Sequence, residues 1–159
     1  MSEPAFDELL RRLVAADVRF VLIGGLALNA WGVVRGTRDV DIAIDPDPEN
    51  IRAVAAVVSA VNGYVQGPES IAGSAFSIAA LLADGQRVLI NTDLGPLDVV
   101  QGLDGVPGHA ELRSRAIEIE LADVSVWVCA LEDLRAMKRA AGRTRDLADL
   151  EDLDAAHPG

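Results

Sequence analysis

The run RGTRDVDIAID, residues 35–45, constrains the fold of this chain more than any other stretch, because its second half alternates acidic and apolar side chains. Successive side chains of a β-strand point to opposite faces, so Asp39, Asp41 and Asp45 would share one face and the valine and isoleucines the other. Carboxylates this close repel one another unless water solvates them or a cation lies between them. The run therefore predicts a strand over 39–44 with either a solvated acidic face or a metal site.

Two of these acids fit a metal site better than the third. Asp39 and Asp41 are two residues apart, which puts both carboxylates within reach of the same pair of divalent cations. A solvated strand face is the alternative for an isolated D-x-D pattern, although the other face of this strand is wholly apolar. Asp45 directly precedes Pro46 at the end of the strand, where turn chemistry explains it.

The composition predicts one folded domain over residues 1–159. Half of the residues are hydrophobic, which is enough for a sizeable core. We expect the catalytic sheet and its helices over about 18–130 and the C-terminal helices over about 131–154. The net charge of −11 argues against a broad basic surface for nucleic acid, but it leaves room for a local basic site.

The sequence carries no sign of secretion or membrane insertion. Its N-terminal run, MSEPAFDELLRRL, is acidic and amphipathic, and no apolar run approaches transmembrane length. The single cysteine, Cys129, lies in the apolar run VSVWVCAL and fits a small buried hydrophobic side chain better than a nucleophile. His109 and His157 have polar, Gly/Pro-rich surroundings without a partner ligand, so we expect neither to be catalytic. These features favour a cytoplasmic protein without membrane contact.

Helical and strand-like patterns alternate along the chain and predict an α+β fold with a mixed sheet flanked by helices. The predicted elements are a helix over 4–17, a buried strand over 18–25, a helix over 26–34, the acidic strand over 39–44, a long helix after Asp47, a mobile loop over 62–75, strands over 87–92 and 96–101, a hairpin of 116–121 with 124–129, and helices over about 131–141 and 144–154. Asp47 is the expected N-cap with Pro48 in the first helical position, and Gly142 separates the last two helices.

Two further features place chemistry next to the acidic strand. Gly24 and Gly25 end a buried strand and lead straight into a helix, where paired glycines let backbone N–H groups approach a phosphate. A tight strand-to-helix turn is the alternative interpretation of this pair. Asp98 lies in the otherwise apolar run GPLDVVQG, and an acid in such a strand needs a partner or a function. If that strand lies beside 39–44, Asp98 completes a site of three carboxylates.

Residues 135–145, RAMKRAAGRTR, hold five basic side chains and no acid in an otherwise acidic chain. They could neutralise a triphosphate or an RNA backbone, or they could simply suit the C-terminal end of a helix dipole. Lys138, the only lysine beside 13 arginines, falls one turn after Leu134 and so beside the apolar stripe of its helix. It is the member of this basic cluster that we expect to bind phosphate.

The run IGGLALNAWGVVRGTRDVDI, followed downstream by LDVV, resembles the DNA-polymerase-β-like nucleotidyltransferase superfamily. The signature of that superfamily is a glycine pair or Gly-Ser, a spacer of about a dozen residues, the pattern D-x-D and a third acid on a later strand. In this chain the spacer is the 13 residues that separate Gly25 from Asp39. Small bacterial nucleotidyltransferases of the type IV abortive-infection toxin group (AbiEii-like) are similar in two runs, RGTRDVDI and LEDLRAMKRAAGRTRDLADLEDL. The overall layout of the chain is also similar to the lincosamide nucleotidyltransferases. The resemblance implies the polymerase-β-like fold.

The resemblance implies a metal-dependent transfer of an NMP from an NTP to an acceptor hydroxyl, with release of pyrophosphate. Two Mg²⁺ ions would be held by Asp39, Asp41 and Asp98, and Asp98 would also orient the nucleophile or accept its proton. Thr37 would lie near the metals, on the same strand face if the strand begins that early.

The resemblance also implies residues that bind the triphosphate. Gly24 and Gly25 would hold the β- and γ-phosphates, and Lys138 would contact the triphosphate. The weaker candidates for the same role are Arg143, Arg145 and Arg35.

The motifs leave the acceptor open. Three kinds of enzyme fit these motifs. One is a toxin that acts on tRNA or another RNA, the second modifies a partner protein, and the third modifies a small hydroxylated molecule such as an antibiotic. The alternative from another class is a catalytically silent nucleotide-binding half of a toxin–antitoxin pair, against which the intact set of acids argues. In a toxin–antitoxin setting a cognate toxin or antitoxin would be the partner.

Overall fold

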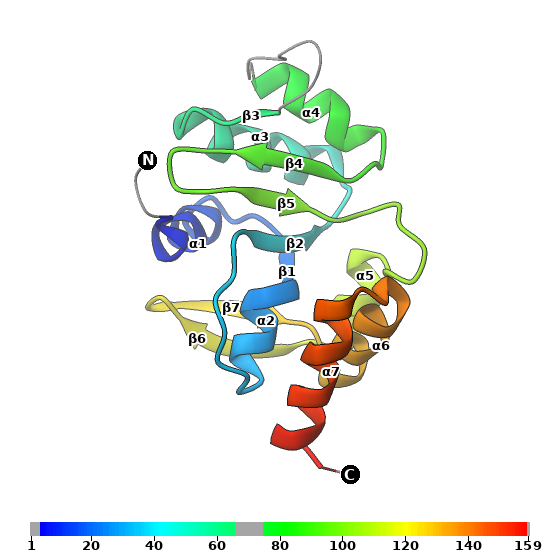
Figure 1. Cartoon of the computed structure of the whole chain (residues 1–159). Coiled ribbons are helices and arrows are strands. Elements are labelled where there is room, and N and C mark those ends of the chain that lie inside the picture. Colours follow the sequence, from blue (N-terminus) through cyan, green and yellow to red (C-terminus); the bar gives the residue numbers. More distant parts are fainter. Residues whose placement is uncertain (1–3, 66–74, 159) are drawn as a thin grey trace.

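The computed structural model describes residues 4–65 and 75–158, which form a seven-stranded mixed sheet with helices on both sides (Figure 1). The strands are β1 (Phe20–Ile23), β2 (Val40–Ile44), β3 (Tyr64–Val65), β4 (Val88–Asn91), β5 (Leu97–Val99), β6 (Ile117–Leu121) and β7 (Val124–Val128). Their order across the sheet is β3-β4-β5-β2-β1-β7-β6. β1 runs parallel to β7 and β2 to β5, and the other neighbouring pairs are antiparallel. The predicted α+β class with a mixed sheet is confirmed.

Helices pack on the two faces of this sheet in separate groups. The helices are α1 (Phe6–Ala15), α2 (Gly24–Ala30), α3 (Pro48–Ala60), α4 (Ala75–Ala83), α5 (His109–Arg115), α6 (Leu131–Ala141) and α7 (Thr144–Ala156). α6 packs against α2 and α7, and α3 packs against α1 and α4. In Figure 1 the first group lies in front of the sheet and α3 lies behind it. Among the described residues, no helix has the length and hydropathy needed to cross a membrane.

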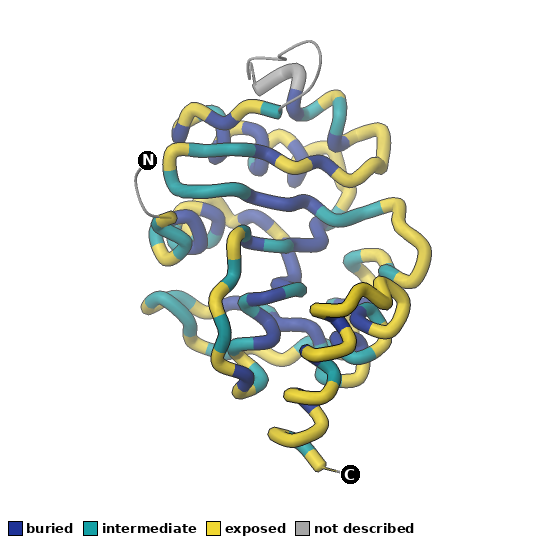
Figure 2. Tube along the Cα trace, in the orientation of Figure 1, coloured by how far each residue is buried: buried dark blue, intermediate teal, exposed yellow. Residues whose placement is uncertain are grey.

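The hydrophobic core is centred on the middle strands of the sheet. All four residues of β1, all three of β5 and four of the five in β2 are buried. Figure 2 shows this buried band crossing the molecule, with exposed residues concentrated on α7 and the loops. α1 adds Leu9, Leu10 and Leu13, whose spacing places them on one face of that helix. The short, uniformly apolar run of β1 therefore forms a central strand that is covered on both faces.

The register of the central strands brings the predicted site residues together. In the antiparallel pair β1–β2, Ile23 lies opposite Asp41, and Ile23 is the residue before Gly24, where α2 begins. In the parallel pair β2–β5, Asp41 lies opposite Asp98. Residues that pair across neighbouring strands share a face of the sheet, so these two carboxylates project to the same side. The predicted placement of the Asp98 strand beside 39–44 is confirmed.

Two predicted helix boundaries are confirmed, one of them with different chemistry. α3 begins at Pro48 with Asp47 as its N-cap residue, but the Asp47 carboxylate accepts a hydrogen bond from Arg19 Nη2 at 3.1 Å instead of capping the helix. α6 ends at Gly142, whose φ of +61° is the left-handed conformation common after the last helical residue.

Other parts of the predicted element list are wrong or incomplete. The second helix begins at Gly24 instead of Leu26, because the glycines themselves form its first turn. Within the predicted loop 62–75, Tyr64 and Val65 form the edge strand β3, and residues 66–74 lie outside the described residues. Periodicity predicts neither α4 nor α5, since α4 carries a single polar residue and α5 follows a Gly/Pro-rich run.

Truncation of a central-strand side chain should weaken the whole fold. Leu22 is fully buried in β1, so Leu22→Ala should lower the free energy of unfolding by about 2–5 kcal/mol through lost burial and the cavity left behind. Leu147→Ala, on the exposed surface of α7, is the matched control and should change it by less than about 0.5 kcal/mol. Urea unfolding followed by circular dichroism measures both, and equal effects would contradict the central role of β1.

Candidate active site

Three carboxylates converge where β2 starts and β5 passes beside it. Asp39 directly precedes β2, Asp41 lies within it, and Asp98 is the middle residue of β5. One oxygen from each carboxylate lies within 4.8 Å of the other two. Oxygen donors in such a cluster are the ligands that Mg²⁺ prefers in proteins. The structure therefore brings together all three acids that the sequence singled out as metal ligands.

Burial and the neighbouring acids destabilise the charged form of Asp41 more than the cation of Arg87 stabilises it. Burial is the largest of the causes that raise the pKa of Asp41 from 3.8 to about 8. The nearby charge of Asp39, a hydrogen bond to Asp39 and the charge of Asp98 raise this pKa further, whereas the charge of Arg87 lowers it. Asp41 Oδ1 is buried and has no hydrogen-bond partner among the described residues. Buried carboxylate oxygens are normally paired or bound to a metal. The donor set and this orphaned oxygen fit a divalent cation.

Arg87 is a member of the site that the sequence analysis missed. Its Nε donates to Asp98 Oδ1 at 3.0 Å and to Oδ2 at 3.2 Å, and its Nη2 also donates to Oδ2. Asp98 is 2% exposed whereas the Arg87 side chain is half exposed, so the arginine reaches in from solvent to a buried acid. Arg87 comes directly before an apolar run that is typical of a strand. Nothing in this local pattern predicts that its side chain will pair with Asp98, which lies 11 residues later.

The two glycines allow the first turn of α2 to pack directly against the acids. Gly24 has a φ of +67°, and a Cβ at this position would lie 1.9 Å from Asp41 Oδ2. A Cβ on Gly25 would lie 2.4 Å from the hydroxyl oxygen of Thr37. Both distances are far below van der Waals contact, so any side chain here would displace its neighbour. The tight-turn interpretation of the pair is thus supported, and phosphate binding by the same backbone stays a prediction.

Thr37 lies next to the acids, although it does not belong to the strand. β2 begins at Val40, so the condition under which Thr37 would share the strand face with Asp39 is not met. Its hydroxyl instead donates to the backbone carbonyl of Asp39 at 3.0 Å while its side chain packs against Gly25. Thr37 therefore holds the segment that leads into β2.

The predicted phosphate-binding cations belong to a charge network between α6 and α7. Lys138 is buried, with its Nζ 2.8 Å from Asp149 Oδ2 and 3.4 Å from Asp146 Oδ1. Arg143 Nε donates to Asp146 Oδ2 at 2.7 Å. Arg35, just before the acidic strand, donates from Nη2 to Asp149 at 2.9 Å. This network fastens α7 to α6 and to the segment that carries Thr37 and Asp39.

A pocket of about 340 Å³, which we call the acid pocket, opens between the acids and α6. Its charged lining consists of Asp41, Arg87, Asp98, Lys138, Arg143 and Asp146, and its apolar lining includes Ile23, Val100, Leu103, Val106, Leu134 and Met137. Gly24 also lines it. The pocket thus adjoins the glycine turn, two of the three clustered acids and two of the predicted phosphate-binding cations at once.

The remaining candidates lie away from the acid cluster. Asp45 accepts hydrogen bonds from Arg19 Nε at 2.8 Å and from the Asp47 backbone N–H at 3.0 Å, as expected of a turn residue. Cys129 is fully buried, and burial raises the pKa of its thiol to about 12, as expected of a small hydrophobic side chain. His157 contacts the carbonyl of Trp31, and His109 starts α5.

Residues 5–156 match the protein family described as "Nucleotidyltransferase of unknown function (DUF6036)". The chain belongs to this family. It is therefore a nucleotidyltransferase, as the glycine pair and the acids led us to expect. No curated protein sequence matches the chain.

Solved structures of nucleotidyltransferases share the fold at low sequence identity. The lincomycin-bound lincosamide antibiotic adenylyltransferase LnuA is 13% identical, with a TM-score of 0.65 and 98% of each chain covered. ANT(2")-Ia in complex with adenylyl-2"-tobramycin is 14% identical, with a TM-score of 0.61. The match covers 95% of this chain and 86% of that chain. The structure described as "a putative nucleotidyltransferase (TM1012) from Thermotoga maritima" is 16% identical, with a TM-score of 0.57; the match covers 92% of this chain and 88% of that chain. The expected nucleotidyltransferase fold is confirmed, and membership of the toxin group stays a prediction.

Replacement of Gly24 should disrupt the acid cluster. Gly24→Ala places a methyl group on Asp41 Oδ2 and puts a non-glycine residue at a φ of +67°, which itself costs roughly 1–2 kcal/mol. We expect a lower melting temperature, and we expect the variant to lose the stabilisation by Mg²⁺ that is predicted for the wild type. Gly36→Ala is the matched control, because a Cβ there meets no atom within 4 Å. A Gly24→Ala protein that Mg²⁺ still stabilises fully would contradict the packing argument.

The raised pKa of Asp41 predicts a pH-dependent stability of the metal-free protein. Between 3.8 and about 8 the folded chain retains a proton on Asp41 that the unfolded chain has released, so the free energy of unfolding falls as pH rises through this window. Asp41→Asn removes this dependence. In EDTA the melting temperature of the variant, relative to wild type, should therefore increase from about pH 5 to about pH 8 and level off above that.

Differential scanning fluorimetry of both proteins across this pH range checks the prediction. Added Mg²⁺ should stabilise the wild type at high pH and leave Asp41→Asn unchanged. A difference in melting temperature that is flat with pH would show that Asp41 is ionised throughout.

Proposed function

We propose that this nucleotidyltransferase transfers an NMP from an NTP to the hydroxyl of a small molecule, with Mg²⁺ as its cofactor. The observation that carries the proposal is the buried, unpaired Oδ1 of Asp41 within a cluster of three carboxylates that borders a pocket. In the transfer, the acceptor oxygen forms a bond to the α-phosphorus while the bond from that phosphorus to the β-phosphate oxygen breaks. The hydroxyl loses its proton and pyrophosphate leaves.

Asp39, Asp41 and Asp98 are the residues that would hold two Mg²⁺ ions. When bound, the metal supplies positive charge that lowers the pKa of the acceptor hydroxyl and neutralises the leaving group. Arg87 keeps the Asp98 carboxylate in one orientation through its paired donors, which leaves this acid poised beside the other two. Asp98 also lines the pocket, and we propose that it orients the acceptor hydroxyl or accepts its proton.

Three of the residues predicted to bind the triphosphate, Gly24, Lys138 and Arg143, line the same pocket. Gly24 presents the start of α2 without a side chain, so backbone N–H groups there can approach a phosphate closely. Lys138 and Arg143 add cationic side chains to the lining of this pocket. Both are already paired with acids of α7, so we propose that they bind phosphate from a preorganised position.

The size and charge of the acid pocket favour a small, uncharged acceptor. A pocket of about 340 Å³ lies within the range typical of small-molecule sites. Its lining carries three aspartates against three cations, so it lacks the excess negative charge that would attract a polycation. The structurally similar LnuA is described as a lincosamide antibiotic adenylyltransferase bound to lincomycin, a precedent for a small-molecule acceptor in this fold.

The other acceptors predicted from the sequence have less support. Transfer to tRNA needs a surface that attracts phosphate, and the net charge of −11 opposes extended RNA binding. The toxin–antitoxin setting, a protein acceptor and a cognate partner stay predictions, as does the silent nucleotide-binding module. Each corresponds to a distinct outcome of one labelling experiment.

Label transfer from α-labelled NTPs tests the proposed function. The protein is incubated with Mg²⁺ and each NTP in turn, together with total RNA, a protein extract or a low-molecular-weight extract. We expect label in a small molecule, and we expect Asp98→Asn to reduce it by more than about 100-fold, because even indirect perturbation of metal ligands costs 10–100-fold. Asp45→Asn, which lies outside the cluster, is the matched control and should retain transfer.

The alternative outcomes identify the alternative functions. Label in RNA or in protein would overturn the small-molecule acceptor and leave the enzyme class intact. Mg²⁺-dependent binding of an NTP without transfer to any fraction would support the silent module.

A further inference from the structure

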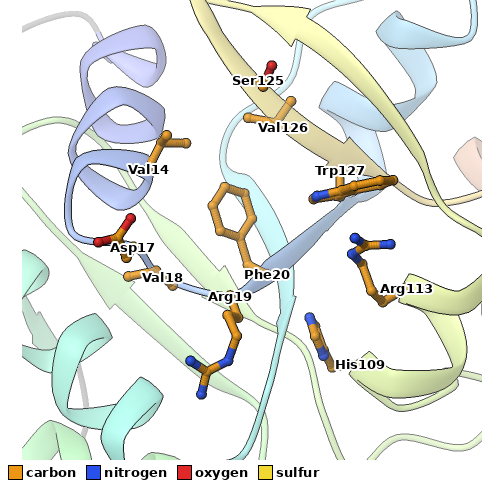
Figure 3. Close-up of a pocket in the computed structure, with 10 residues that line it drawn as sticks. All are labelled: Val14, Asp17, Val18, Arg19, Phe20, His109, Arg113, Ser125, Val126 and Trp127. Atoms are coloured by element: carbon orange, nitrogen blue, oxygen red, sulfur yellow. The ribbon is translucent and has the colours of Figure 1, made fainter.

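A second pocket lies at the other end of β1 from the acid cluster. It has a volume of about 460 Å³, larger than the acid pocket, and we call it the Trp127 pocket. Figure 3 shows the Phe20 ring at its centre, with Val14 and Val18 on one side and Trp127 on the other. Val126 adds to the apolar floor. None of the residues that line it belongs to the acid cluster or to the predicted phosphate-binding set.

Arg113 contributes an unpaired cation to this pocket. Its guanidinium carbon lies 3.2 Å from the centroid of the Trp127 ring, so the aromatic face holds it in place. Within residues 4–65 and 75–158, it is the one partly buried arginine without a carboxylate within 4.0 Å or a side-chain hydrogen bond. The chain carries a net charge of −11 and pairs most of its partly buried arginines with its own acids. The N–H donors of Arg113 are therefore not used by the chain's own acids among the described residues.

Among the described residues, the other polar groups of the pocket leave Arg113 as its one cation without an acidic partner. Arg19 is already bound by the carboxylates of Asp45 and Asp47, at 2.8 and 3.1 Å. Burial lowers the pKa of His109, so this side chain is neutral at physiological pH and can donate or accept a hydrogen bond. Asp17 lies across the pocket from Arg113 in Figure 3, so negative charge would be attracted to the Arg113 side and repelled from the other.

We propose that the Trp127 pocket binds a small monocarboxylic acid with an apolar body. The guanidinium of Arg113 would pair with the carboxylate, since its planar set of N–H donors matches a carboxylate in two parallel hydrogen bonds. The apolar body would lie on Phe20, Val18 and Val126, where it gains from leaving water. One cation beside a neutral histidine suits a single negative charge better than a phosphate dianion. The volume falls within the range of small-molecule sites.

Two tryptophans make the test of this site internally controlled. The chain has Trp31 and Trp127 as its only tryptophans, and Trp31 Nε1 donates to the Cys129 carbonyl at 2.9 Å, outside the Trp127 pocket. Two-dimensional ¹H–¹⁵N spectra of the full chain give one indole signal for each, which Trp127→Phe assigns. Titration with 4-phenylbutyrate should shift the Trp127 signal to saturation and leave the Trp31 signal in place.

Matched probes and variants separate recognition of charge from general hydrophobic binding. 4-Phenylbutan-1-ol carries the apolar body without the charge, and acetate carries the charge without the body; both should bind at least about tenfold more weakly. Arg113→Gln should weaken 4-phenylbutyrate binding by about tenfold or more, in line with the loss of a charge-assisted hydrogen bond. Arg139→Gln, at an exposed arginine of α6, is the control and should bind as wild type does.

Three results would overturn the proposal. These are equal affinity for the acid and the alcohol, unchanged binding by a folded Arg113→Gln protein, and the absence of a saturable shift at the Trp127 signal. Thermal unfolding of each variant establishes that it is folded. The measurement uses neither nucleotide nor metal, so its outcome is independent of the proposed transfer reaction.

Discussion

The repulsion among three carboxylates at the junction of β2 and β5 is the constraint on which the rest of the structure depends. The parallel register sets Asp41 opposite Asp98, and Asp39, directly before β2, brings its carboxylate into the same cluster. Burial makes the repulsion stronger and raises the pKa of Asp41 to about 8. Folding alone would not favour this arrangement, since a core that excludes the acids would cost less. Its presence therefore points to a cation that the chain binds in order to act.

The surrounding contacts hold the acids in place at several points. Arg87 binds Asp98 from the solvent side, and Gly24 brings the first turn of α2 against Asp41. Thr37 holds the backbone of Asp39. Behind these contacts, Arg35 and Lys138 both bind the buried Asp149 of α7, so the C-terminal helices are fastened to the segment that leads into the acidic strand. Buried ion pairs of this kind contribute little net stability but specify one arrangement of the elements, which a metal site needs.

The sequence was sufficient to predict the parts of the site that depend on local pattern. Alternation placed Asp39 and Asp41 on one face, Pro48 and Gly142 marked helix ends, and an acid in an apolar strand identified Asp98. Contacts between distant residues were out of reach, because arginines are scattered through the chain and no periodicity says which acid each one will meet. Arg87 was missed for this reason. Lys138 was selected from its position beside the apolar stripe, yet its pairing with Asp149 depends on how α7 packs. α4 was missed because a nearly uniform apolar run carries no helical period.

The two interpretations of the glycine pair, a tight turn and a phosphate-binding backbone, are consequences of the same geometry. A phosphate can approach the start of α2 closely only where no side chain covers the backbone, and the acids can lie beside that turn only under the same condition. At Gly24 the space that a Cβ would need is occupied by Asp41, and at Gly25 by Thr37. The absence of side chains therefore brings the predicted metal ligands and the predicted phosphate-binding backbone to the same point. The proposed transfer needs this coincidence, because the metal and the backbone would act on the same triphosphate. Loss of activity on replacing either glycine would accordingly report on both roles together.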